Sequence, residues 1–244
     1  MKLLLASVVL IAAALTPIAN AQKGEKPWME WSRKDAEKVL ADSPWSHTQV
    51  ETNTSEMFYS PTADPRTSGG SANDSSRLGQ GASNQAVDVK YRIRFFSARP
   101  VRQALARMME LQQKLEPTML ERLRAFAELE SSNSIIVTVS FESSDGRFVG
   151  KATEAFGSAV TGTLKNNTYL ERSIDGKRLF LTEYAPPGKD GFGARFIFLR
   201  EMDGQPFITP QAGNIRFYSE FGKGVKLDKQ FKVAEMIYKG QLEY

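Results

Sequence analysis

The sequence predicts an α+β fold, an antiparallel β meander packed by two central helices and preceded by a tryptophan-rich helical arm. Three observations predict it. Residues 87–96 alternate apolar and charged side chains, the period-two pattern of a strand with one solvated face. Residues 99–130 carry apolar side chains at helical spacing instead. From Thr168 onward, short apolar runs alternate with turn residues, among them the hairpin-type pairs Asp175-Gly176 and Asp203-Gly204.

Residues 1–21 have the pattern of an export signal. Lys2 precedes the apolar run Leu3–Leu15, and Ala19-Asn20-Ala21 has the small residues of a cleavage site. The apolar run is shorter than the roughly 20 residues that span a membrane, and no later stretch approaches that length. We therefore expect an exported bacterial protein, periplasmic or secreted, that begins at Gln22 and has no transmembrane segment.

Residues 22–61 are predicted to form a helical arm. Ser32 and Asp35 have the spacing of a helix capping box, and Asp42-Ser43-Pro44 ends the helical run. A short helix is therefore expected near residues 33–41. Helices shorter than about 12 residues are marginal in water, so this one needs a surface to pack against, and each indole can bury about 150–250 Å².

The aromatic side chains of the arm have two interpretations. They hold the arm against the body of the same chain as a latch, or they form an exposed surface that contacts a sugar, a lipid or a partner protein. In the second interpretation, the contact residues are Trp28, Trp31, Trp45, Phe58 and Tyr59. The single histidine, His47, is interpreted as a surface or packing residue rather than a catalytic one.

The segment from Trp28 to Trp45 also has the pattern W-x-x-W-S-x-x-D-A-x-x-x-L-x-D-S-P-W. Together with SEMFYSPTADPR at residues 55–66, this pattern resembles a group of exported bacterial proteins of unknown function. The resemblance extends into the C-terminal half of the chain. It implies export, and it supplies no activity and no catalytic residues.

Residues 62–86 are predicted to be a flexible linker, because their Ser, Thr, Asn and Gly content offers little to bury. The body then occupies residues 87–244. Its two helices, near 99–115 and 117–130, are expected to cover one side of the sheet. Residues 134–143 are predicted to be a central strand, while 151–164 are ambiguous. Later strands are expected near 168–173, 177–184, 193–200, 205–209, 214–221, 226–235 and 237–244.

The composition excludes several kinds of chemistry. With no cysteine and one histidine, the chain cannot form disulfides, a thiol nucleophile, or a metal site built from cysteines or several histidines. Its formal charge of +4 is modest for a chain of 244 residues, so we expect no nucleic-acid partner. The run Gly191–Phe196 lacks the last glycine of a dinucleotide fingerprint. No cofactor is expected.

Three functions remain open at this point. The first is a non-enzymatic module of the cell envelope that binds a protein partner or ligand. The second is a carrier of an apolar small molecule, held between the sheet and the methionine-containing helices. The third is a glycan hydrolase with paired carboxylates, for which the candidates are Glu142, Glu171, Glu183, Glu201 and Glu220.

Overall fold

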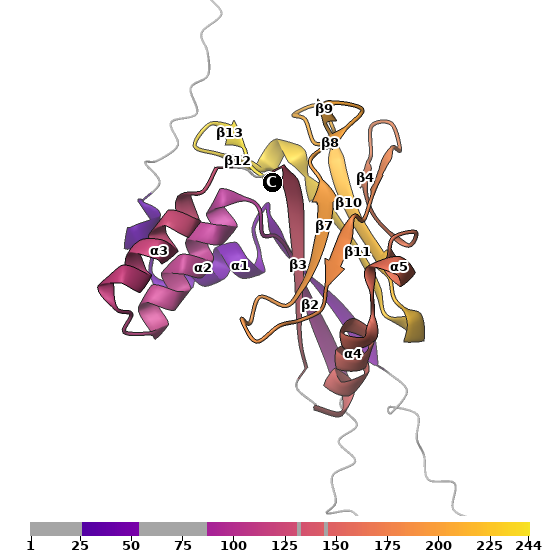
Figure 1. Ribbon diagram of the computed structural model, residues 1–244, viewed down its shortest axis with the longest axis horizontal. Helices are drawn as coiled ribbons and strands as arrows, with labels where there is room; N and C mark the ends of the chain where they lie inside the picture. The colour runs from indigo at the N-terminus through magenta and orange to yellow at the C-terminus, as the bar shows by residue number, and fades with distance from the viewer. Residues whose placement is uncertain (1–25, 54–86, 131–132, 144–145) are drawn as a thin grey trace, which may run out of the picture.

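A computed structural model describes residues 26–53, 87–130, 133–143 and 146–244 (Figure 1). The predicted signal peptide, the linker and the side chains of Phe58 and Tyr59 lie outside these residues. The α+β class with antiparallel sheets is as the sequence predicts. Its strands are divided between two main sheets that pack face to face.

The first sheet, sheet A, has the order β1-β2-β3-β7-β6. Every neighbouring pair in it is antiparallel. The predicted central strand is its third member, and the strand predicted at 87–96 is its second. The strands are β1 (Ser46–Asn53), β2 (Val87–Phe95), β3 (Ser134–Ser143), β6 (Glu183–Ala185) and β7 (Ala194–Leu199).

The second sheet, sheet B, has the order β11-β10-β4-β5 and is antiparallel throughout. Two small hairpins, β8–β9 and β12–β13, complete the described strands. The strands are β4 (Thr168–Arg172), β5 (Arg178–Phe180), β8 (Glu201–Met202), β9 (Gln205–Pro206), β10 (Asn214–Glu220), β11 (Lys226–Lys232), β12 (Ile237–Tyr238) and β13 (Gln241–Leu242).

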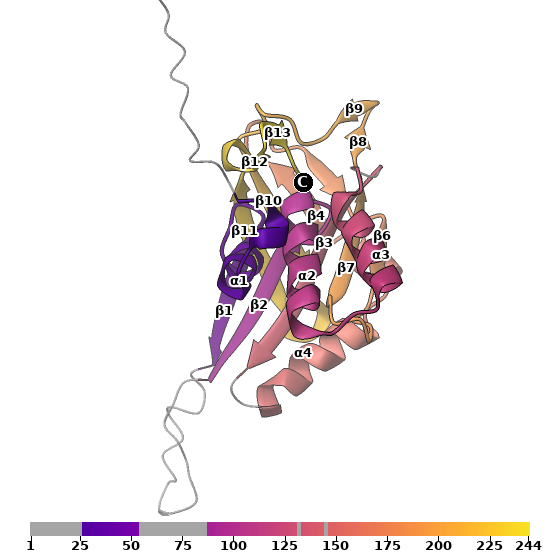
Figure 2. The same ribbon diagram turned by 90° about the vertical axis from the view of Figure 1, so that its left-hand side faces the viewer.

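Helices cover the face of sheet A that sheet B leaves free. Figures 1 and 2 show α1 to α3 on this face and α4 at the lower end of the sandwich. The predicted pair of central helices is thus present and covers one side of a sheet. The helices are η1 (Trp28–Glu30), α1 (Arg33–Ala41), α2 (Arg99–Gln112), α3 (Pro117–Glu128), α4 (Gly146–Ser158), α5 (Thr161–Leu164), η4 (Gly222–Gly224) and η5 (Val233–Glu235).

The predicted capping box begins α1. The Ser32 hydroxyl accepts a hydrogen bond from the N–H of Asp35 (3.2 Å), and the Asp35 carboxylate accepts one from the N–H of Ser32 (2.9 Å). Hydrogen bonds from Ser32 also hold the pKa of Asp35 below its ordinary value. This helix contacts α2, and β1 follows it as an edge strand of sheet A. Residues 26–53 therefore pack against the rest of the chain.

Phenylalanine rings fill the space between the two sheets. Phe95 meets Phe231 edge to face with ring centroids 4.8 Å apart, and Phe196 meets Phe217 at 5.2 Å. All four rings are buried. Such edge-to-face pairs contribute about 0.5–1.5 kcal/mol beyond the burial of their area. Apolar residues at every second position of β2, β3, β7 and β10 thus contribute to one core that joins sheet A to sheet B.

The chain passes from one sheet to the other at Leu181 and Thr182. The N–H of Leu181 binds the carbonyl of Thr168 in sheet B, and the N–H of Thr182 binds the carbonyl of Ile197 in sheet A. This switch divides the strand predicted at 177–184 into two short strands, β5 and β6.

The two hairpin signals in the sequence are confirmed. Gly176 (φ 67°) lies in the turn between β4 and β5, and Asp203 (φ 55°) and Gly204 (φ 72°) lie between β8 and β9. Gly193, from the rejected dinucleotide pattern, has a packing role instead. A Cβ atom there would lie 2.2 Å from the carbonyl oxygen of Val139, so β7 approaches β3 where only glycine fits.

One prediction about β2 is wrong at Arg94. The sequence predicts a solvated row of cations at Lys90, Arg92 and Arg94, yet Arg94 is only 8% exposed. Its Nε donates to the carbonyl of Leu40 at the end of α1 (2.6 Å), and its Nη1 donates to Ser140 (3.1 Å). Burial lowers its pKa to about 10. The reason is that α1 covers this end of the strand face, which the local alternation pattern could not indicate.

Candidate functional site

Two of the predicted contact tryptophans are buried inside the chain. Trp28 is 3% exposed, packs with Ala106 and Ala127, and donates from Nε1 to Glu128 (2.7 Å). Trp45 is 7% exposed and donates from Nε1 to the carbonyl of Glu243 (2.8 Å). Both positions agree with the latch interpretation of this segment, since a buried indole offers no surface to a ligand.

Trp31 is partly buried beside the same cluster. Its Nε1 donates to the carbonyl of Lys26 (3.1 Å), and its own carbonyl accepts from Nε of Arg107 in α2 (2.7 Å). The structure therefore separates Trp28 and Trp31, near α2, from Trp45, near the C-terminal hairpin. It does not bring the three indoles together into one platform.

His47 lines a surface cleft of about 570 Å³ between β1, the end of α1 and β11. Its ring lies 4.7 Å from the ring of Phe231. Burial lowers the pKa of His47, and the nearby Lys229 lowers it further, while Asp42 and Glu235 oppose the shift. A half-buried imidazole that lines a surface cleft and packs against a core phenylalanine is compatible with the surface or packing role that the sequence predicts.

The five candidate glutamates lie on five different strands. Glu142 pairs with Arg92 (2.6 Å), and Glu171 pairs with Arg178 (2.5 Å). Glu171 lies opposite Arg216 in the register of β4 and β10. Glu220 is four residues further along β10, about 13 Å away, beyond the roughly 5–10 Å of a glycosidase pair.

The remaining two candidate carboxylates are also apart from this pair. Glu201 lines a cleft of about 450 Å³ with Asn133 and Arg200, and Glu183 is exposed at the edge of sheet A. Glu220 lines a different cleft. In the described residues, no ion-pair network and no shared cleft joins any two of the five candidates.

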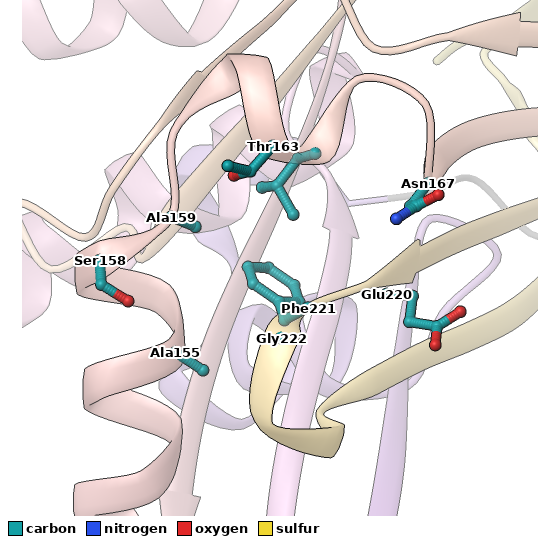
Figure 3. Close-up of a pocket in the computed structure, with 9 residues that line it drawn as sticks. Ala155, Ser158, Ala159, Thr163, Asn167, Glu220, Phe221 and Gly222 are labelled. Atoms are coloured by element: carbon teal, nitrogen blue, oxygen red, sulfur yellow. The ribbon is translucent and has the colours of Figure 1, made fainter.

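The cleft at Glu220 is the candidate site. It has a volume of about 380 Å³ and lies between the end of α4, α5 and the turn that follows β10 (Figure 3). Apolar and polar side chains both line it, as in most small-molecule sites. Its lining residues are Ala155, Ser158, Ala159, Thr163, Leu164, Asn167, Glu220, Phe221 and Gly222.

Phe221 fixes the position of the cleft. Its ring packs on Phe156 of α4 at 4.5 Å and approaches Tyr184 at 6.2 Å. The N–H of Phe221 binds the carbonyl of Val225, which closes the turn around Gly222. A helix, a strand and a turn thus meet at one ring, and the cleft lies where their small residues leave space.

Glu220 and Asn167 supply the polar end of the cleft, and Figure 3 shows them side by side there. The N–H of Glu220 binds the carbonyl of Asn167 (3.1 Å), so the backbone sets their spacing. One carboxylate oxygen, Oε2, accepts from the Tyr218 hydroxyl (2.8 Å), and this hydrogen bond raises the pKa of Tyr218. Among the side chains that the structure describes, which do not include that of residue 223, Glu220 forms no ion pair.

The hydroxyl groups of the cleft serve the local backbone. Thr163 Oγ1 donates to the carbonyl of Val160 (2.9 Å), and Ser158 donates to the carbonyl of Glu154 (2.7 Å). Their donor hydrogens are therefore engaged, and the carboxylate of Glu220 has none to give. The site thus offers mainly acceptors at its rim, with the Asn167 amide as the side chain that can donate.

Sequence reasoning found one member of this cleft and missed the others. Glu220 is among the candidate carboxylates, whereas Asn167, Thr163 and Phe221 carry no motif. The signal present in the sequence was the interruption of residues 151–164 by Gly157 and Gly162. Gly157 lies in α4 and Gly162 in α5, and the segment divides between them at Ala159 and Val160, beside the cleft.

Other kinds of site find no support in the described ranges. Among those residues, no group of three or more His, Asp or Glu side chains could hold a metal ion. Their helices include none with the length and apolar character that crossing a membrane requires. Comparisons with protein-family models, with curated proteins and with solved structures gave no match to this chain.

Proposed function

We propose that the protein is a non-enzymatic binding module of the bacterial cell envelope, and that its cleft holds a small ligand rich in hydroxyl or amine donors. The observation that carries this proposal is the rim of Glu220 and Asn167 beside an apolar wall. The export pattern at the N-terminus favours an envelope location. The apolar carrier and the hydrolase stay predictions, and no observation favours either one.

The chemistry of the rim defines the ligand. A carboxylate accepts only, so its partners are hydroxyl, amine or ammonium groups. Hydrogen bonds to a charged group contribute about 1.5–3 kcal/mol each. Ala159 and Gly222, which are the more exposed of the small lining residues, meet the carbon skeleton of the same ligand, while Phe221 and Leu164 are nearly buried. A single sugar residue and a short amine both fit this description.

Titrations with defined probes test the proposal. We would follow the ¹⁵N-labelled chain by NMR while adding glucose, galactose, N-acetylglucosamine, lysine or putrescine. We expect at least one probe to shift the amide signals of Asn167, Glu220 and Gly222. Sugars alone would define a glycan ligand, and amines alone would define a cationic one.

Two variants with matched controls locate the ligand. A Cβ at Gly222 meets no atom within 4 Å, so the backbone accommodates the first side-chain atom of Gly222→Leu, and the rest of the side chain adds volume to the cleft. Glu220→Gln removes the charge. Each should weaken binding about tenfold or more, Glu220→Gln through the loss of one charged hydrogen bond and Gly222→Leu by filling the cleft. Gly150→Leu in α4 and Glu183→Gln in β6 should bind as the parent does.

Two results would contradict the proposal. One is the absence of any shift at the cleft with every probe up to tens of millimolar, as an order of magnitude for weak sites. The other is unchanged affinity in both Gly222→Leu and Glu220→Gln, since a ligand in this cleft has to contact one of them.

A further inference from the structure

The side of the sandwich between β1 and β11 contains an unusual contact. Nε2 of Gln49 in β1 donates to the carbonyl of Lys226 (2.7 Å), and Oε1 accepts from the N–H of Asp228 (2.8 Å). These two backbone groups of β11 are the ones that the peptide groups of a neighbouring strand would bind. The Gln49 amide thus occupies the place of one peptide group of a strand that sheet B lacks.

The β11 edge continues beyond this contact. β11 is the outermost strand of sheet B. Because the N–H of Asp228 points away from β10, the backbone groups of Gln230 and Lys232 point the same way, at intervals of two residues. In the described part of the chain, no backbone hydrogen bond reaches Gln230 from this side. The edge is therefore free to bind another extended chain.

The cleft at His47 provides space beside the β11 edge for a bound peptide. Its volume of about 570 Å³ lies directly against Asp228, Lys229 and Gln230. Asp42, His47 and Thr48 form the facing wall. This volume is in the range of known ligand sites, about 300–1,000 Å³. A peptide segment paired with Gln230 would thus enter existing space.

The charged side chains along β11 favour one class of binding partner. Lys226 and Lys229 form no ion pair within the described residues. The carboxylate of Asp228 is already bound by two nitrogens of Arg216 (2.7 and 2.6 Å). Lysines on an edge strand repel a second copy of the same edge. The same charges favour an acidic segment.

We propose that the β11 edge binds an extended acidic peptide segment of another protein by strand addition. The backbone of Gln230 supplies the main-chain hydrogen bonds, and Lys226 and Lys229 contact carboxylates of the segment. This recognition mode gains its affinity from main-chain pairing and its specificity from the side chains. The site is separate from the Glu220 cleft, and the proposal does not depend on the ligand of that cleft.

Three synthetic peptides test the proposal on the full ¹⁵N-labelled chain. The first is acetyl-Val-Glu-Val-Glu-Val-amide, the second is its N-methylated copy at alternate residues, and the third has lysine in place of glutamate. We expect the first to shift and protect the amides of Gln230 and Lys232. N-methylation should abolish this effect, and the lysine peptide should bind about tenfold more weakly, the value of one charged hydrogen bond.

A pair of variants distinguishes the contribution of the Gln230 backbone to binding from that of its side chain. Gln230→Pro removes the outward N–H, and proline is tolerated on the free side of an edge strand. Gln230→Ala retains that N–H and is the matched control. We expect Gln230→Ala to bind the glutamate peptide within about twofold and Gln230→Pro to lose about tenfold or more, as one main-chain hydrogen bond requires.

Several results would overturn the proposal. Equal binding by Gln230→Pro and Gln230→Ala would exclude strand addition at this edge. Equal binding of the N-methylated peptide would exclude main-chain pairing. Equal binding of the lysine peptide would exclude selectivity for acidic segments. A dimer that forms without peptide and disappears in Gln230→Pro would identify a second copy as the occupant. If Gln230→Pro does not fold, the N-methylated peptide decides.

Discussion

The tryptophan segment and the Glu220 cleft differ both in their sequence features and in their roles in the structure. Residues 26–45 concentrate the indoles and a long motif, and their aromatic side chains are largely turned inward. The cleft has a plain sequence of alanines, a threonine, an asparagine and a glutamate, and it is open. The comparison teaches that aromatic content indicated packing here, while the candidate site arose where small residues left space.

This contrast implies that the two regions have different roles. The tryptophan segment should contribute to the free energy of unfolding, and the cleft should contribute little to it and bind a ligand instead. Substitutions in the two regions test whether stability and binding are divided in this way.

Trp45→Ala should cause the largest loss of stability. It removes a buried ring that meets Tyr238 edge to face at 6.1 Å, together with the hydrogen bond to Glu243. Large-to-small changes of this kind cost about 3–5 kcal/mol. Urea unfolding measures the change. Trp31→Ala is the control and should lose less, because Trp31 is only partly buried. Equal losses of unfolding free energy in Trp45→Ala and Trp31→Ala would contradict the view that burial of the indole determines its contribution to stability.

Trp28→Phe should cost about 1.5–3 kcal/mol, the value of one hydrogen bond to a charged group. The ring volume is largely retained, while the indole N–H to Glu128 is lost. Glu128 keeps its hydrogen bond from Nε2 of Gln103 (3.0 Å), so its carboxylate still has a hydrogen-bond donor. The same urea titration measures this effect. A loss as large as that of Trp45→Ala would show that the polar contact, rather than the ring, holds the segment.

The latch should also weaken in mild acid through His47. Burial lowers its pKa, so the folded protein favours the neutral ring while the unfolded chain titrates near the ordinary 6.5. This contribution to stability is complete above pH 6.5 and declines as the pH falls below 6.5 towards the folded pKa. The slope of unfolding free energy between pH 7 and 5.5 measures it. His47→Gln should flatten that slope, and an unchanged slope would exclude His47 as its cause.

Glu220→Gln should have the smallest effect on stability, within about 0.5 kcal/mol, as for most surface changes. The amide can still accept from the Tyr218 hydroxyl, so that hydrogen bond is retained. The matched change Glu183→Gln should behave alike in urea and differ only in ligand titrations. A large destabilisation by Glu220→Gln alone would assign the carboxylate to the fold instead of the ligand.

Local patterns in the sequence were sufficient for most of the fold. The capping box at Ser32 and Asp35, the alternation in β2 and the two Asp-Gly turns depend on neighbours within a few residues. They are therefore visible in the sequence. The burial of Arg94 depends on α1, more than 50 positions away along the chain. No local pattern carries that information.

The candidate site was less accessible to prediction for the same reason. Glu220 and Asn167 become neighbours only because β10 pairs with β4. The assignment of strands to two sheets was equally hidden, since Leu181 and Thr182 look like the interior of one continuous strand. Periodicity predicts the elements of this chain, and long-range pairing determines which of their side chains share a cleft.

The hydrogen bond from Trp45 to Glu243 joins residues 198 positions apart. Ribosomes add about 5–20 residues per second, so the indole of Trp45 waits roughly 10–40 s for its acceptor to be synthesised. During that interval β1 and β2 can pair, yet the ring has no native polar partner. The order of synthesis thus delays completion of the fold until residue 243 has emerged.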